Sequence, residues 1–340
     1  MKKIIVTGGS GFIGTNLVNY LLRKNFYVIN IDKLSYSSNK YNKRKNKNYK
    51  FFKVDINNKE KLIEIIKRYK PKAIFNLAAE THVDRSIDSP KDFIFSNILG
   101  VYNLLEVLRF FKKNKKLIKL IHISTDEVYG DINNPKIRSD EEFAYKPSSP
   151  YSATKASSDH LIKSYVRTYG IKAVISNCCN NYGPYQFPEK LIPKLISNIF
   201  NNKKLPVYGK GLNSREWIHV NDHCSALFAL YSKGKTGESY NVGTGKNMKN
   251  IDLVKKIIFL CKSKNIKIGN NVKIKFVKDR PGHDFRYALN NKKILKKIKW
   301  VSKIKMKKGL SDTLDWYLQN KSFIKSISKK LYVKRLGLSL

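Results

Sequence analysis

The segment Tyr151-Ser152-Ala153-Thr154-Lys155 carries two side chains suited to proton transfer. Residues four apart on a helix project from the same face, so the Tyr151 hydroxyl and the Lys155 ammonium would lie together. A free tyrosine titrates near pH ~10, but a neighbouring ammonium favours the phenolate. The spacing therefore predicts a tyrosine base whose pKa is lowered by Lys155. Because Tyr-x-x-x-Lys occurs in many helices, this prediction needs support from other parts of the chain.

The triplet Thr125-Asp126-Glu127 follows an apolar run, residues 120–123, that is typical of a buried strand. The carboxyl ends of parallel strands open into the ligand crevice of a doubly wound sheet, so we expect these side chains to reach a substrate. Alcohol oxidation needs one base, whereas elimination of water needs a second base for a carbon-bound proton and an acid for the leaving hydroxyl. Two adjacent carboxylates can divide these tasks. The alternative is that Asp126 caps the next helix and Glu127 is solvated.

The N-terminus has the pattern of a phosphate-binding turn. An apolar run at residues 4–7 leads into Gly8-Gly9-x-Gly11-x-x-Gly14 and then into a helical pattern. Glycines permit a tight turn and let backbone N–H groups approach a pyrophosphate at the start of the helix. Strand, turn and helix in this order predict a dinucleotide site.

Asp32 ends the next predicted strand about 20 residues after the glycines, where a carboxylate bonds the ribose 2′-OH of the cofactor. Its charge would repel the 2′-phosphate of NADP, so NAD is favoured, although Lys33 and Arg44 could accommodate that phosphate. The ends of later strands are placed for further cofactor contacts, at Asp55, Ile56, Leu77, Ala78 and Ala79.

Alternating strand and helix patterns position these groups. The runs typical of buried strands are residues 4–7, 27–31, 51–54, 73–77, 120–124 and 173–176, and a helical stripe runs from residue 93 to residue 108. This alternation predicts an α/β fold with a doubly wound parallel sheet of Rossmann type. We expect a Rossmann domain at 1–177 with a strand returned from about 237–243, a smaller α+β substrate lobe at 178–320 and a tail at 321–340.

Composition narrows the class of protein. A net charge of +43 would suit a nucleic-acid-binding protein, but 41% hydrophobic residues argue for a large core, and the excess is lysine rather than the arginine that reads bases. We expect no signal peptide, because the first residues contain no long apolar region, and no uninterrupted apolar stretch reaches the roughly 18 residues of a membrane span. Cys178, Cys179, Cys224 and Cys261 form neither a C-x-x-C pair nor a metal-ligand cluster, so we expect a cytoplasmic protein without a metal.

The chain resembles the dTDP-glucose 4,6-dehydratases of the extended short-chain dehydrogenase/reductase superfamily. The glycine turn and the Tyr151/Lys155 pair are shared across the superfamily, whereas the Thr-Asp-Glu triplet and the run Ala-Glu-Thr-His-Val-Asp-Arg-Ser at residues 79–86 are more specific. The match extends to about residue 317. Cys179 stands where serine is usual, and the tail lies outside the match.

The resemblance implies a reaction sequence. Tyr151, assisted by Thr125, removes the proton of the C4 hydroxyl of dTDP-glucose while hydride moves from C4 to NAD. Glu127 then takes the C5 proton as Asp126 protonates the C6 hydroxyl, and water leaves. Hydride returns to C6, so NAD is regenerated and acts as a tightly held prosthetic group.

The resemblance also implies the ligand contacts and a homodimer through the helix at residues 93–108 and the Tyr151 helix. Cofactor contacts are implied at Gly8, Gly11, Phe12, Ile13, Gly14, Asp32, Lys33, Leu34, Ser35, Asp55, Ile56, Leu77, Ala78, Ala79, Thr81, Ser96, Tyr151, Lys155 and Asn181. Substrate contacts are implied at His82, Thr125, Asn180, Lys190, Leu191, Pro206, Tyr208, Arg215, Asn250, Arg280, His283 and Tyr287.

Physical chemistry favours two of these substrate residues. Arg215 and Arg280 stand out in a lysine-rich chain, because a guanidinium binds a diphosphate in bidentate fashion and an ammonium does not. We expect Trp217 to pack within the protein rather than to stack on the base of the nucleotide. The alternatives are a UDP-glucose 4,6-dehydratase, since either pyrimidine nucleotide could fit, or an epimerase or decarboxylase of nucleotide sugars, which would lack the Asp126-Glu127 pair.

Overall fold

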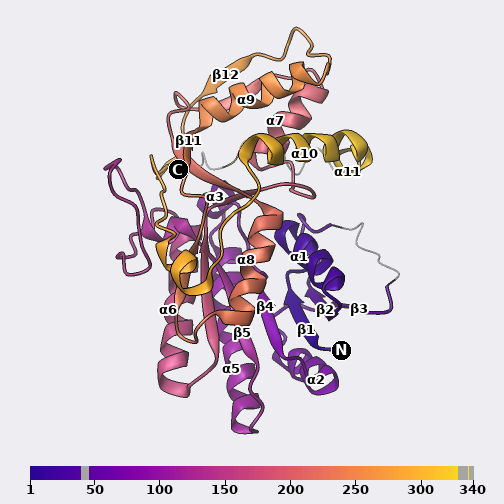
Figure 1. The fold of residues 1–340 in the computed structure, drawn as a ribbon, viewed down its shortest axis with the longest axis vertical. Helices are drawn as coiled ribbons and strands as arrows, with labels where there is room; N and C mark the ends of the chain where they lie inside the picture. Colours follow the sequence, from indigo (N-terminus) through magenta and orange to yellow (C-terminus); the bar gives the residue numbers. More distant parts are fainter. Residues whose placement is uncertain (40–45, 328–335, 337–340) are drawn as a thin grey trace.

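The computed structural model describes residues 1–39, 46–327 and 336, so Arg44 and most of the expected tail lie outside the described residues (Figure 1). Its centre is a seven-stranded parallel sheet with the strand order β10-β6-β5-β4-β1-β2-β3, which confirms the predicted α/β, Rossmann-type fold. The strands are β1 (Lys3–Thr7), β2 (Tyr27–Asp32), β3 (Tyr49–Lys53), β4 (Ala73–Asn76), β5 (Lys119–Thr125), β6 (Ala173–Cys178) and β10 (Ser239–Val242). The six apolar runs predicted as strands correspond to β1–β6.

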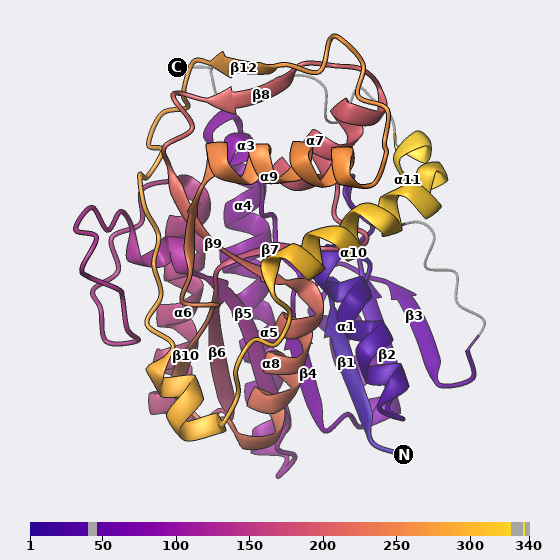
Figure 2. The ribbon, with the colours of Figure 1, turned by 45° about the horizontal axis from the view of Figure 1, so that its top comes forward.

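Helices cover both faces of this sheet, as the continuous apolar runs of its strands require. Two helices, α1 (Phe12–Arg23) and α8 (Val220–Lys233), pack on one face, while α2 (Lys59–Tyr69), α5 (Gly100–Lys113) and α6 (Pro150–Tyr169) pack on the other (Figure 2). The strand order reverses between β1 and β4, which is where a doubly wound sheet opens its ligand crevice. The glycine turn follows β1, so it lies at this crevice.

One long helix carries a feature that the sequence prediction missed. α4 (Lys91–Phe93), η1 (Ile94–Leu99) and α5 form a continuous helix, Lys91–Lys113, with a π-helical segment at η1. It is the one helix among the described residues that is long and apolar enough to cross a membrane by length and composition. Half of its most apolar stretch is buried, and Val101, Leu104 and Leu108 lie in the core beside the sheet, so it packs as a core helix.

The second half of the chain adds a smaller lobe above the sheet (Figure 1). Its strands are β7 (Asn180–Tyr182), β8 (Leu205–Tyr208), β9 (Ser214–His219), β11 (Asn247–Lys249) and β12 (Ile274–Val277), and its helices are α7 (Leu191–Phe200), α9 (Asn250–Ser263), α10 (Met306–Gln319) and α11 (Lys321–Ser326). The short elements α3 (Val83–Asp88), η2 (Asp126–Tyr129) and η3 (Ile294–Ile298) lie outside these groups. A separate apolar core that includes Leu195, Leu253 and Leu314 holds the lobe together. The domain boundary near residue 177 stays a prediction.

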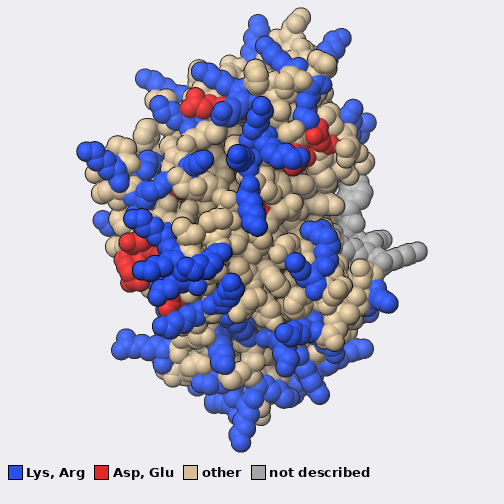
Figure 3. All heavy atoms as spheres, viewed as in Figure 1, with Lys and Arg blue, Asp and Glu red and all other residues tan. Residues whose placement is uncertain are grey.

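Basic side chains are distributed widely over the surface. In Figure 3, lysine and arginine cover much of the visible face, with few acidic side chains between them. On this face the positive charge is therefore spread over both the sheet domain and the upper lobe rather than gathered in one groove.

Candidate active site

The glycine turn between β1 and α1 leaves the start of the helix open to an anion. Gly11 is the N-terminal cap of α1, it receives no side-chain hydrogen bond, and the first turn of the helix contains no acidic residue. Gly8 has a φ of +66° and lies so close to the strand beside it that an added Cβ would be 2.6 Å from the backbone nitrogen of Ala78. A Cβ at Gly14 would be 2.1 Å from the carbonyl oxygen of Gly8. These glycines bring the backbone N–H groups of α1 to a position where a pyrophosphate fits.

Asp32 is held where it can accept hydrogen bonds from a ribose. Its Oδ2 accepts from the backbone nitrogen of Ser10 at 2.9 Å and its Oδ1 from that of Leu34 at 2.7 Å. Oδ1 also accepts from the Ser38 hydroxyl at 3.3 Å, so Oδ2 is the oxygen that retains acceptor capacity, because an oxygen of an ionised carboxylate has about two lone-pair sites. The Lys33 ammonium points instead toward Asp55 and Glu80, at 3.9 and 3.7 Å from their carboxylate oxygens. The residues present thus fit the adenosine half of NAD.

The other predicted cofactor residues surround the same crevice or support it. Ala78 receives a weak hydrogen bond at its nitrogen, 3.4 Å from the Thr7 hydroxyl, and Ser96 is buried in η1. Ile56 is buried in the apolar core against the side that carries α5. The amide of Asn181 is engaged by its own chain, since Nδ2 donates to the carbonyl oxygen of Cys179 at 3.0 Å. Direct contacts of these residues with a cofactor stay a prediction.

Helix α6 presents the predicted tyrosine and lysine. It starts at a capping box formed by Ser149 and Ser152 and has proline in its first turn, so its N-terminus is fixed. The Tyr151 backbone nitrogen donates to the Ser86 hydroxyl at 3.2 Å, and the Lys155 ammonium donates to the carbonyl oxygen of Ile123 at 2.6 Å. Both side chains are buried beside the carboxyl end of β5.

The pKa of Tyr151 differs from the sequence-based expectation. Burial raises it well above the usual value, and the nearby Glu127 carboxylate adds to the rise, while a hydrogen bond with Thr125 partly opposes it. Burial also lowers the pKa of Lys155 to about 8, although the Asp159 carboxylate one turn along α6 works against that shift. The side chains of the protein therefore raise the pKa of Tyr151, whereas the helical spacing predicted a lowering by Lys155, because spacing along a helix does not reveal burial or the carboxylates opposite.

The two adjacent carboxylates of η2 have different surroundings. Asp126 is 3% exposed, and its Oδ2 has no hydrogen-bond partner among the described residues. Burial, then Glu127 and Glu216, raise the pKa of Asp126 well above its usual value. Burial raises the pKa of Glu127 as well, but three cations that oppose this rise, Arg280, Arg215 and Lys190, surround it. The pKa of Asp126 is therefore raised further than that of Glu127, so Asp126 holds its proton more strongly than its neighbour does.

A cavity of about 430 Å³ opens between the sheet and the upper lobe, with Glu127 among its lining residues. All the predicted substrate residues except Thr125 line it: His82, Asn180, Lys190, Leu191, Pro206, Tyr208, Arg215, Asn250, Arg280, His283 and Tyr287. Trp217 also lines the cavity while belonging to the apolar core of the lobe. Two buried amide oxygens of the lining, Asn180 Oδ1 and Asn250 Oδ1, have no hydrogen-bond partner within the described part of the chain. They are available to a polar ligand.

Both predicted arginines of the cavity are held in place by the protein. Arg215 donates to the carbonyl oxygen of Asp284 at 2.7 Å, and its guanidinium lies 4.2 Å from the centroid of the Tyr287 ring. Arg280 forms a buried ion pair with Asp84. Tyr208 donates its hydroxyl to the same carboxylate at 2.7 Å. The cavity therefore presents two oriented guanidiniums, which suits the binding of a diphosphate.

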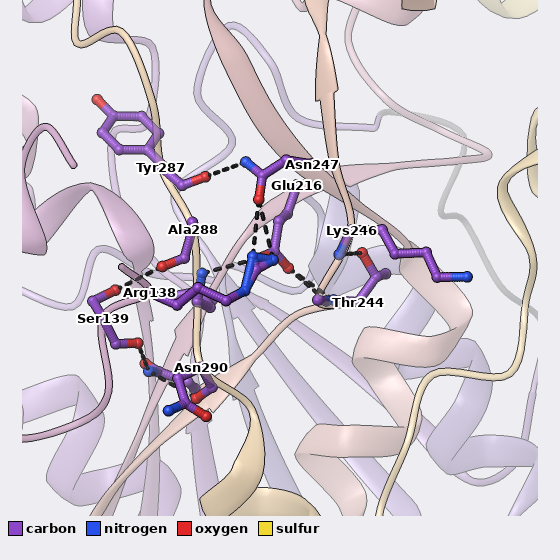
Figure 4. Close-up of polar contacts among 12 residues, drawn as sticks. Arg138, Ser139, Glu216, Thr244, Lys246, Asn247, Tyr287, Ala288 and Asn290 are labelled. Carbon is purple, nitrogen blue, oxygen red and sulfur yellow. Dashed lines mark hydrogen bonds and ion pairs between the residues drawn. The ribbon is translucent and has the colours of Figure 1, made fainter. Parts of the chain in front are cut away.

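Glu216, the residue after Arg215 in β9, is the centre of a network of hydrogen bonds (Figure 4). Glu216 is fully buried, and its Oε1 accepts from Arg138 at 2.9 Å and from the backbone nitrogen of Leu289 at 2.9 Å. Its Oε2 accepts from the backbone nitrogens of Thr244 and Gly245 at 3.0 and 2.9 Å. These four hydrogen-bond donors, one guanidinium and three backbone N–H groups, hold the Glu216 carboxylate in place. They anchor β9, and with it Arg215.

Several of these residues were not singled out from the sequence. Asp84 lies within the run at residues 79–86 that carries the resemblance, and its position in that run was its only signal. Nothing in the local sequence indicates Arg138, whose partner lies 78 residues away. Among the described residues, no group of His, Cys, Asp and Glu could hold a metal ion.

A family model and curated relatives match nearly the whole chain. The model described as GDP-mannose 4,6 dehydratase matches residues 5–313. The chain is 43% identical over 352 residues to a dTDP-glucose 4,6-dehydratase of Neisseria meningitidis serogroup B, and the alignment covers 99% of each chain. Such coverage includes most of residues 321–340, so the expectation that the tail lies outside the resemblance was wrong. The expectation rested on short motifs, which the tail lacks.

Solved structures agree with this match. A dTDP-glucose 4,6-dehydratase from Bacillus anthracis, in complex with NAD, is 40% identical with a TM-score of 0.86, over 96% of this chain and 100% of that chain. A dTDP-glucose 4,6-dehydratase from Streptomyces venezuelae, with NAD and TYD bound, is 35% identical with a TM-score of 0.88, again over 96% of this chain and 100% of that chain.

Proposed function

The chain belongs to the GDP-mannose 4,6-dehydratase family, and we propose how its residues share the work of a dTDP-glucose 4,6-dehydratase. The reaction is an NAD-dependent elimination that converts dTDP-glucose into dTDP-4-keto-6-deoxy-glucose and water. The observation that carries the assignment of roles is the adjacent pair Asp126 and Glu127, in which burial raises both pKa values but raises that of Asp126 further. An epimerase or a decarboxylase needs no such acid and base.

Tyr151 is the base for the C4 hydroxyl. Its buried hydroxyl is next to Thr125, whose hydrogen bond makes the phenolate less unfavourable. The positive charge of Lys155 acts in the same direction, because a cation nearby stabilises an anion in a buried site. NAD, when bound, would supply the hydride acceptor for the oxidation at C4 and the hydride donor for the reduction at C6. The glycine turn and Asp32 would hold its pyrophosphate and its ribose.

Glu127 and Asp126 carry out the elimination. Glu127 faces the cavity, and the cations around it favour its ionised form, so it takes the proton from C5, which the C4 ketone has made acidic. Asp126 is kept protonated by burial and by neighbouring carboxylates, so it gives its proton to the C6 hydroxyl, which leaves as water. Glu127 afterwards returns its proton to C5. Tyr151 has then gained one proton and Asp126 has lost one, and the two are reset before the next turnover.

The cavity binds the nucleotide diphosphate. Arg215 and Arg280 are oriented by the protein, and Lys190 lies between them and the cofactor side, where its ammonium donates to the carbonyl oxygen of Thr81 at 2.7 Å. The asparagine oxygens of Asn180 and Asn250 are free to accept hydrogen bonds from the sugar or the base. We infer that this set fixes the sugar with C4 toward Tyr151 and with C5 and C6 toward Glu127 and Asp126.

The test is product formation from two nucleotide sugars. The purified protein is incubated with dTDP-glucose and, separately, with UDP-glucose, and the 4-keto product is followed by its absorbance in alkali. We expect product from dTDP-glucose, with UDP-glucose turned over far more slowly. A protein with Asp126→Asn and Glu127→Gln keeps the shape of the cavity and is the matched control. No product from either sugar, by protein that carries NAD, would overturn the assignment.

We infer that the protein is a homodimer formed through the helix Lys91–Lys113. Its outward face exposes Ile94, Phe95, Leu99 and Tyr102, a continuous apolar strip beside α6. A surface of this kind is rarely left in contact with water. Light scattering of Phe95→Glu should show a monomer where the unchanged protein shows a dimer. A dimer of unchanged affinity in this variant would exclude the helix as the interface.

The free cysteines support a cytoplasmic location. All four are buried, and none forms a disulfide. Fractionation of the source cells would test this proposal, since enrichment of the protein outside the cytoplasm would contradict it.

A further inference from the structure

A loop on the cofactor side of the molecule reaches across to the substrate cavity. Residues 33–38 follow Asp32, and the first part of this loop is pinned by the hydrogen bond from Leu34 to that carboxylate. Tyr36, further along the same loop, donates its hydroxyl to Glu189 Oε1 at 2.9 Å. Its ring also meets the Phe187 ring edge-on, with centroids 5.6 Å apart. The loop beside the expected ribose site is thus attached, through Tyr36, to a residue 153 positions further along the chain.

Glu189 lies at the boundary between the two ligand sites. It lines the cavity, yet its side chain is only 6% exposed. Its second oxygen, Oε2, accepts from Arg85 Nε at 3.1 Å. The Arg85 guanidinium in turn lies 4.0 Å from the centroid of the Tyr36 ring. Tyr36, Arg85 and Glu189, here called the Glu189 cluster, therefore form a closed set in which each member contacts the other two.

The charges of the cluster are matched. A carboxylate with so little exposure needs a cation or several donors, and Arg85 together with the Tyr36 hydroxyl supplies them. His82 lies 4.0 Å from Glu189 Oε2 but is neutral, because burial, and then the nearby Lys190 ammonium, lower its pKa to about 3. Arg85 is the cation that contacts the Glu189 carboxylate directly, and its stacking on Tyr36 adds a cation–π contact.

Further contacts tie the same segment, residues 184–190, to the cofactor side. Asn16 of α1 donates to the carbonyl oxygen of Pro184 at 3.0 Å. At the other end, Lys190 donates to the carbonyl oxygen of Thr81, a predicted cofactor residue, at 2.7 Å. A segment that lines the substrate cavity therefore rests on the helix of the glycine turn, on the loop after Asp32 and on the chain after β4.

We propose that the Glu189 cluster is a positioning device that couples retention of NAD to occupation of the nucleotide-sugar cavity. This inference rests on the proposed function. A ligand that orders residues 184–190 also orders the loop after Asp32, and the coupling acts equally in the other direction. The reaction needs such a device, because the hydride taken from C4 must return to the same sugar. A cofactor that left in mid-reaction would leave an oxidised sugar behind.

The test is the rate at which NAD leaves the holoenzyme. The protein is purified with its cofactor and diluted, and released NAD is measured after filtration, with and without saturating dTDP. In the unchanged protein we expect dTDP to slow release at least about tenfold. Glu189→Gln removes the charge and keeps the shape, and Tyr36→Phe removes only the hydroxyl. In both variants we expect release without dTDP to be at least about tenfold faster, and the slowing by dTDP to fall to about twofold or less.

The matched control is Glu238→Gln, because Glu238 is a partly exposed glutamate paired with Lys235 and Lys293 away from both ligand sites. It should release NAD at the rate of the unchanged protein. The proposal is overturned if dTDP does not slow release from the unchanged protein, or if it slows release equally in Tyr36→Phe, which is conservative enough to fold if Glu189→Gln does not. A protein that shows this coupling but makes no 4-keto sugar would refute the proposed function and leave the coupling standing.

Discussion

Arg280 and Asp84 form a buried ion pair at the substrate cavity, with Nη1 2.7 Å from Oδ1, although they are 196 residues apart in the chain. The Nε of Arg280 is buried and has no hydrogen-bond partner among the described residues. One edge of the guanidinium is thus fixed by the protein, and the other is left for a ligand. Asp84 therefore acts through Arg280 rather than on the substrate.

Asp84→Asn should weaken substrate binding without changing the chemistry. The amide cannot balance the charge of Arg280, and a charge-assisted hydrogen bond contributes about 1.5–3 kcal/mol, so we expect KM for dTDP-glucose to rise roughly tenfold with kcat within about twofold. Steady-state kinetics measures both. Asp312→Asn, which removes an exposed partner of Lys308, is the control. An equal loss in kcat would mean that Asp84 takes part in the reaction itself.

Glu127→Gln and Asp126→Asn should stop the reaction at different points. Without the C5 base, oxidation at C4 still proceeds slowly while elimination stalls, so absorbance of the reduced cofactor at ~340 nm should build up after dTDP-glucose is added to Glu127→Gln. Asp126→Asn keeps the shape of a protonated acid and should bind the sugar normally. Turnover should fall about 10²- to 10⁴-fold in each, the usual contribution of a general acid or base. Unchanged turnover of Glu127→Gln would show that Glu127 is not the C5 base.

The fold was predictable because its signals are local. Runs such as residues 4–7 and 120–124 are apolar on both faces, as a covered parallel sheet requires, and the glycine turn can be read from a few residues. The cavity was predictable only through the resemblance, since His82, Pro206 and His283 have no pattern in common. Their proximity depends on how the upper lobe closes over the sheet.

Two kinds of feature could not be read from local patterns. The Arg280–Asp84 pair and the Glu189 cluster join loops whose meeting depends on the whole topology. The direction of the Tyr151 pKa was also missed, because helical spacing places Lys155 nearby but says nothing of burial or of Glu127 across the site. The sequence therefore predicts secondary structure better than it predicts electrostatic contacts between residues that are far apart in the chain.

Asp159→Asn should move the alkaline limb of the pH profile. Burial lowers the pKa of Lys155 to about 8, and the Asp159 carboxylate opposes that shift, while His122 on β5 is neutral because burial lowers its pKa. If the ammonium is needed to stabilise the Tyr151 phenolate, kcat falls as the pH rises through about 8. Without the carboxylate the pKa of Lys155 drops further, so the limb should move to lower pH by about one unit, which is 1.36 kcal/mol.

The control for this shift is Tyr145→Phe. Tyr145 donates to the same Asp159 carboxylate at 3.0 Å but carries no charge, so its removal should leave the limb in place. The measurement is kcat from pH 6 to pH 10 with saturating dTDP-glucose. A limb that stays near pH 8 in Asp159→Asn would show that Lys155 does not set it.

Arg138→Gln should destabilise the protein, and more strongly at pH 7 than at pH 5. Glu216 is fully buried, and removal of Arg138, the one cation paired with it among the described residues, leaves a charge that three backbone donors must hold, at a cost of about 3–5 kcal/mol. Because Arg138 lowers the pKa of Glu216, its loss raises the folded-state pKa further above the unfolded value. The folded state then binds more protons between these two pKa values, so stability falls as the pH rises through that window.

Urea unfolding at both pH values measures the difference, and the double variant with Glu216→Gln should recover part of the loss at pH 7. A deficit that is equal at both pH values, and not relieved by the second substitution, would mean that Arg138 stabilises the fold through packing rather than through the charge of Glu216.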